Sequence, residues 1–219
     1  VGMKERSALC ESHGEELANT LSHAVGALLS AVGLALMLRL AAPLSAWHVT
    51  GVSIFGGSLI LLYGVSALYH HVTSHGKKRL LQILDHAFIF VLIAGSYTPW
   101  LLVNLRGPWG WSLLGVVWGL ALGGIVLKAV FLPRFDRLGT ALYVAMGWLV
   151  CVAFRPFVES VNAAGLAWLV AGGLCYTGGV WFYLKRDMRY GHFVWHLFVI
   201  GGSLCHIAAV VAGVLVAGY

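Results

Sequence analysis

The chain has 219 residues, of which 60% are hydrophobic and only 10% are charged, and its formal net charge is +6. Soluble domains carry about 25% charged residues, so this composition excludes most soluble folds, and its apolar content excludes intrinsic disorder. The mean hydropathy of +0.87 over the whole length indicates a protein that crosses a membrane several times. The basic residues lie in small clusters between apolar runs, which is typical of membrane topology signals and does not indicate nucleic-acid binding.

Continuous apolar stretches divide the chain into seven predicted membrane spans. We place them at residues 17–42, 47–69, 83–104, 109–131, 138–154, 163–184 and 193–217. The fifth is the shortest, and Arg155-Pro156 predicts its end. The runs lack the alternation of a membrane β-barrel, and glycine pairs inside them favour close helix packing. The sequence therefore predicts an all-α integral membrane protein, a seven-transmembrane helix bundle in one domain over residues 17–217, preceded by a cytoplasmic segment over residues 1–16.

The distribution of basic residues predicts how this bundle lies in the membrane. Of the 14 Lys and Arg residues, all but Arg39, Arg106 and Arg155 fall on the side of the N-terminus and the even-numbered connections. By the positive-inside rule, the N-terminus is cytoplasmic and the C-terminus lies outside. We therefore expect a multi-pass protein of the cell membrane with an orientation opposite to that of G-protein-coupled receptors.

Ionisable side chains in or beside membrane helices are costly and point to functional sites. His192 and His196 are four residues apart at the start of the seventh span, so their imidazoles face the same way. Ser66 and His70 repeat this spacing at the end of the second span, and Asp85 lies at or just before the start of the third. The second span ends where the third and seventh begin, so we expect these side chains to converge near the cytoplasmic face.

The expected cluster has the composition of a catalytic zinc site. Three histidines, here His70, His192 and His196, supply the protein ligands of such a site, and water takes the fourth position. A carboxylate beside that water, here Asp85, can hold it and act as general base. Ser66 lies one turn deeper than His70 and can hydrogen-bond to the same water or to a developing oxyanion.

Each part of this interpretation has a structural alternative. The histidine pair can be an interfacial hydrogen-bonded couple, the serine can serve helix packing, and the aspartate can cap the third helix. Glu16, Asn19 and His23 form a polar stripe on the first span, where the glutamate can simply favour the helix N-terminus and the histidine can be a hydrogen-bonded core residue. His206 lies ten residues beyond His196, about 15 Å deeper along a helix, so we expect it to play a structural role and not to share the metal.

Four ordered groups of residues carry a resemblance to a known family: Glu15-Glu16 to Ser22-His23, Ser66 to Asp85-His86, Gly95 to Pro99, and His192 to His196 with His206. With these motifs, the chain resembles the hemolysin III family of bacterial membrane proteins, within the superfamily of adiponectin and progestin receptors. The resemblance implies seven helices, a cytoplasmic N-terminus and a zinc ion near the cytoplasmic side. It maps the zinc ligands onto His70, His192 and His196, and the associated aspartate and serine onto Asp85 and Ser66. The superfamily is similar to alkaline ceramidases, which implies hydrolysis of a lipid amide.

Three functions compete at this point. The first is a membrane-embedded zinc hydrolase of a lipid amide or ester involved in membrane lipid homeostasis, whose partners are membrane lipids. The second is a non-enzymatic sensor or receptor of lipid or membrane state, in which a structural zinc joins the second and seventh helices. The third, a pore-forming hemolysin, is disfavoured because few charged residues lie within the spans to line an aqueous path. The same ligands serve the first two functions, so the residues alone do not separate them.

Overall fold

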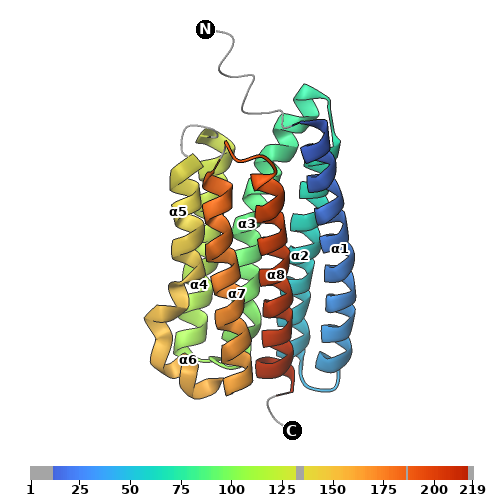
Figure 1. Cartoon of the computed structure of the whole chain (residues 1–219). Coiled ribbons are helices and arrows are strands. Elements are labelled where there is room, and N and C mark those ends of the chain that lie inside the picture. The colour runs from blue at the N-terminus through green and yellow to red at the C-terminus, as the bar shows by residue number, and fades with distance from the viewer. Residues whose placement is uncertain (1–11, 132–135, 186, 217–219) are drawn as a thin grey trace.

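The structure is a computed structural model that describes residues 12–131, 136–185 and 187–216. Within these residues, seven helical spans are long and apolar enough to cross a membrane, and no strand occurs. The spans stand side by side in one bundle, with the start of the first helix and the end of the last at opposite ends (Figure 1). This confirms the predicted seven-helix membrane fold. The orientation stays a prediction, and the first eleven residues of the N-terminal segment lie outside the described residues, as do the basic residues Arg134 and Arg186.

The described residues form these elements in chain order: α1 (His13–Ala41), α2 (Ala46–His71), α3 (His75–Leu102), α4 (Pro108–Phe131), α5 (Asp136–Gly147), the 3-10 helix η2 (Leu149–Ala153), α6 (Phe154–Ser160), α7 (Ala163–Leu184), α8 (Gly191–Val210) and the π-helical turn η3 (Val211–Leu215). The fifth span consists of α5, η2 and α6 together, and η3 extends α8 in the seventh span. α1 packs against α2 and α8, α2 against α3, α3 against α4, and α7 against α8. α5 and α7 make few contacts with each other.

The predicted start of the third helix is wrong by about two turns. α3 begins at His75, with Ser74 at its N-cap, and not at residue 83. Its first turns contain Lys, Arg and Gln, which are good helix formers but too polar to register as a membrane span. Asp85 consequently lies inside α3 and does not cap it.

The predicted end of the fifth span is also wrong. Helical structure continues past Arg155-Pro156 to Ser160, after an irregular passage through η2. Pro156 occupies the first turn of α6, where a backbone N–H has no partner inside the helix, so the missing donor breaks no hydrogen bond.

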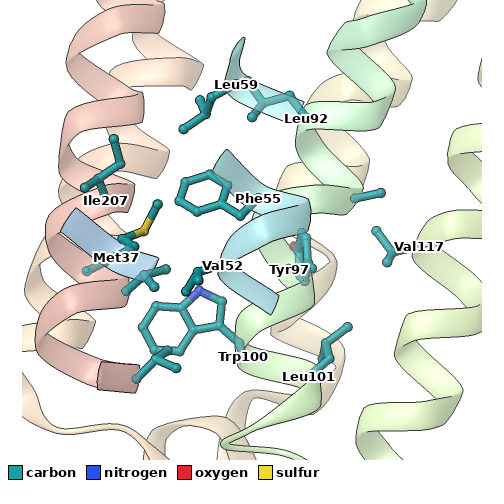
Figure 2. Packing of buried hydrophobic residues seen from close by; sticks show 14 of the residues in the cluster. Met37, Val52, Phe55, Leu59, Leu92, Tyr97, Trp100, Leu101, Val117 and Ile207 are labelled. Atoms are coloured by element: carbon teal, nitrogen blue, oxygen red, sulfur yellow. The ribbon is translucent and has the colours of Figure 1, made fainter. Parts of the chain in front are cut away.

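A continuous apolar core lies between the helices. Met37 of α1, Phe55 of α2 and Val117 of α4 are completely buried and belong to one apolar cluster with Trp100 of α3 (Figure 2). Membrane helices associate chiefly through close packing, because lipid tails are as apolar as the side chains. Small residues therefore matter at the helix contacts.

We expect Gly51→Ala to destabilise the bundle by about 1–3 kcal/mol, the usual cost of overpacking. A Cβ atom at Gly51 of α2 would lie 2.8 Å from the backbone Cα of Pro99 in α3, which cannot move without shifting the helix. Thermal unfolding in detergent measures the effect. Gly57→Ala in the same helix is the matched control, because a Cβ there has no neighbour within 4 Å. Equal melting temperatures for the two variants would contradict the packing argument.

Candidate metal centre

Three histidines from two helices meet at the end of the bundle where α1 begins. His70 lies in the last turn of α2, and His192 and His196 lie in the first two turns of α8. One ring nitrogen from each lies within 4.8 Å of the others. The ring centroids are 4.6 Å apart for His192 and His196, and 5.1 Å apart for His70 and either partner. The structure thus brings together the three predicted ligands, which we call the three-histidine group.

The hydrogen bond of His70 determines which of its nitrogens is available to a metal. Its Nδ1 lies 2.8 Å from Oε2 of Glu16. A carboxylate can only accept, so Nδ1 carries the proton and Nε2 keeps its lone pair. That Nε2 atom is buried and has no hydrogen-bond partner among the described residues. A buried acceptor without a donor is rare in proteins, and a metal ion at this position would satisfy it.

A second chain of hydrogen bonds defines the ring of His196. Oγ of Ser22 donates to the carbonyl oxygen of Asn19 at 2.9 Å and lies 3.0 Å from Nδ1 of His196. Because the single hydroxyl proton is used toward the carbonyl, Nδ1 is the donor to Ser22 and Nε2 holds the lone pair. His196 is therefore in the same tautomer as His70.

A cavity of about 190 Å³ extends from the three-histidine group into the bundle. His192 and His196 line one end, and Trp100, Leu105 and Phe157 line the other, near α6. Most of the remaining wall consists of aliphatic and aromatic side chains. The cavity thus joins a polar end that can hold a metal to a long apolar interior.

The two predicted catalytic residues line this same cavity. Ser66 is 1% exposed and Asp85 is 7% exposed. Buried helical serines elsewhere donate to a carbonyl of their own helix, as Ser30 does to Gly26 and Ser58 does to Phe55. The Oγ of Ser66 instead has no hydrogen-bond partner among the described residues. Their positions permit the predicted roles, and the roles themselves stay predictions.

Residues of α1 and α3 complete the surroundings of the group, and sequence reasoning did not place them. The sequence predicts only a helix-terminal role for Glu16 and a topology role for the basic residue Lys78, yet Nζ of Lys78 donates to Oε1 of Glu16 at 2.5 Å. The sequence does not pair Ser22 with His196, whose Nδ1 it contacts. The three-and-four spacing of Glu16, Asn19 and His23 is the available signal, because it puts them on one face of α1.

Three further histidines, His23, His86 and His206, line the cavity without belonging to the group. His23 stacks on His196 with ring centroids 3.4 Å apart and an interplanar angle of 10°. Its ring nitrogens have no hydrogen-bond partner among the described residues, so it is not the hydrogen-bonded core histidine considered above. His206 lies deeper on α8, packs edge-on against Tyr176, and is outside the three-histidine group, as its spacing predicts.

Together, the fold and the cluster define a seven-helix membrane protein with three converging histidines at one end of an apolar cavity. The sequence model of the family described as "Haemolysin-III related" matches residues 12–207, and the chain belongs to this family.

The chain is also similar in sequence to individual proteins over most of its length. The "Hemolysin-3 homolog" of Bacillus subtilis is 46% identical over 190 residues, which cover 86% of this chain and 89% of that protein. The "Hemolysin-3" of Bacillus cereus is 43% identical, covering 86% and 87%. The human "Monocyte to macrophage differentiation factor" is 32% identical over 206 residues, covering 90% and 83%. The rice "Heptahelical transmembrane protein ADIPOR2" is 28% identical over 177 residues, covering 67% and 74%. The predicted resemblance is confirmed.

Proposed function

We propose that the protein binds one zinc ion through His70, His192 and His196 and hydrolyses an amide or ester bond of a membrane lipid. The observation that supports the metal is the buried Nε2 of His70, which has no hydrogen-bond partner among the described residues and belongs to a group of three imidazoles. Three imidazole ligands suit zinc and leave a fourth position for water. The apolar cavity that begins at the group supports a lipid chain as the bound part of the substrate.

The residues around the group account for the chemistry of such a reaction. When bound, zinc polarises a carbonyl and lowers the pKa of a coordinated water to about 7. Asp85 accepts the proton of the attacking water and returns it to the leaving amine or alcohol, so that one water is consumed and two products form. Ser66, whose hydroxyl has no hydrogen-bond partner within the described part of the chain, stabilises the carbonyl oxygen as it gains negative charge. The apolar wall holds the chain and excludes bulk water.

The lipid would enter from the side of the bundle, between α5 and α7. These helices make few contacts with each other, and both contribute to the cavity wall. A hydrogen bond of 3.1 Å from Nε1 of Trp148, just after α5 in the fifth span, to Oγ1 of Thr177 in α7 links these two spans on the exposed surface of the bundle. By the distribution of basic residues, we place the metal end near the cytoplasmic face of the cell membrane.

A lipid-hydrolysis assay tests this proposal. The purified protein in lipid nanodiscs is incubated with N-acyl sphingoid bases and with glycerol esters, and products are followed by mass spectrometry. We expect release of a free fatty acid that depends on zinc and stops with a chelator. A protein that holds zinc but cleaves none of these lipids would contradict the hydrolase.

A structural metal is the second candidate function, and one observation favours it. α2 and α8 share few direct contacts, so a metal held between His70 and His196 would join two helices that otherwise meet mainly through α1. A sensor built this way would lose stability on chelation and form no product. The apolar lining of the cavity does not support an aqueous pore.

A further inference from the structure

Helix α1 contributes no histidine to the three-histidine group, yet it contacts two of the three members. Glu16 in its first turn accepts the Nδ1 proton of His70, at 2.8 Å. Ser22, less than two turns further along, accepts the Nδ1 proton of His196, at 3.0 Å. α1 packs against α2 and α8, which carry these histidines.

We infer that Glu16 and Ser22 are the positioning residues of the metal centre, and that α1 serves as its supporting helix. Each accepts the Nδ1 proton of an imidazole and so leaves the Nε2 lone pair available to a metal. Metal-bound histidines commonly donate their second ring N–H to a carboxylate or another acceptor, which fixes the ring and raises its basicity. This inference rests on the proposed metal binding, but concerns residues that no ligand assignment includes.

Lys78 holds Glu16 in place, and Glu15 ties the start of α8 to α1. Lys78 of α3 donates to Oε1 of Glu16 at 2.5 Å and lies 5.2 Å from the centroid of the Tyr69 ring. Glu16 is thus held from both sides, and its negative charge has a buried counter-ion. Glu15 accepts the backbone N–H of Tyr190 at 2.8 Å, which anchors the start of α8 to the same turn of α1.

The neighbouring residues Glu15 and Glu16 therefore act on two different helices. Glu16 reaches a ligand on α2 directly, and Glu15 positions the helix end that carries the other two ligands. Ser22 then completes the support at the second turn of α8. The charge on Glu16 predicts a larger effect than the neutral hydroxyl of Ser22, because charge-assisted hydrogen bonds are about twice as strong as neutral ones.

The test is zinc affinity, measured by competition with a fluorescent zinc chelator on the full chain in detergent. Loss of a supporting partner lowers metal affinity by about 10- to 100-fold. We expect Glu16→Ala near the upper limit, Ser22→Ala near the lower, and Glu16→Gln between them, because its amide oxygen can still accept from His70. Two matched controls should bind as the wild type does: Glu159→Gln, from an exposed pair with Arg155, and Ser30→Ala, whose hydroxyl bonds within α1.

The melting temperature of each metal-free variant separates positioning from folding. Positioning predicts weaker zinc binding while the metal-free protein melts as the wild type does, most clearly in Glu16→Gln. Affinity within twofold of wild type in Glu16→Ala and Ser22→Ala would overturn the inference and leave the proposed function intact. Affinity losses matched by the controls, or explained by metal-free unfolding, would overturn it as well. A wild-type protein that binds no zinc would overturn both proposals.

Discussion

Asp85→Asn is expected to lower the rate of lipid hydrolysis by about 100- to 10,000-fold, the range for loss of a general base. Asparagine keeps the size of the side chain but cannot accept the proton of the attacking water. Asp85 lies inside α3 on the cavity wall and is buried, so the change removes a charge without opening the fold to solvent. The rate of fatty-acid release by equal amounts of wild type and variant measures the effect.

The matched control for this prediction is Asp187→Asn, at an exposed position between α7 and α8. It should retain full activity. Zinc content should be unchanged in both variants, since neither residue belongs to the three-histidine group. Full activity in Asp85→Asn would refute the general-base mechanism while leaving metal binding in place.

Removal of the metal is expected to destabilise the wild-type bundle. It should leave a variant that lacks the metal-binding histidines unaffected. A ligand that binds only the folded state contributes about 2.7 kcal/mol when its free concentration is 100 times its dissociation constant. Thermal unfolding with free zinc at that level and with chelator measures this difference. The contribution is expected because the metal would link α2 to α8 through His70 and His196.

His192→Ala/His196→Ala is the variant in which chelation should change nothing. His48→Ala is the control, because His48 lies at the other end of the bundle in a hydrogen bond with Ser45. It should respond to chelator as the wild type does. An equal chelator response in the double variant would show that the stabilising metal binds elsewhere.

The sequence predicted the number of spans correctly because a helix in lipid must be apolar along its whole length. The same criterion placed the start of α3 too late. Residues 75–82 are helical but polar, and hydropathy detects where a helix enters an apolar environment and not where its hydrogen bonds begin. The passage through η2 at residues 149–153 carries no hydropathy signal either.

The convergence of His70, His192 and His196 could be predicted because it depends only on which ends of which helices share a side of the membrane. The contacts of Glu16 and Ser22 could be predicted only in part, because the spacing of Glu16, Asn19 and His23 indicates one face of α1 but not the side chains that this face contacts. They depend on the rotation of α1 about its own axis, and α1 exposes apolar residues over much of its surface. No hydrophobic stripe therefore marks the face that turns toward α2 and α8.

Elemental analysis of the detergent-purified protein is the measurement that tests the central claim most directly. It is made beside His192→Ala/His196→Ala, purified in the same way and shown to be folded. The account predicts about one zinc per chain in the wild type and none in the variant. A well-folded wild type that holds no metal even after zinc is added would contradict it.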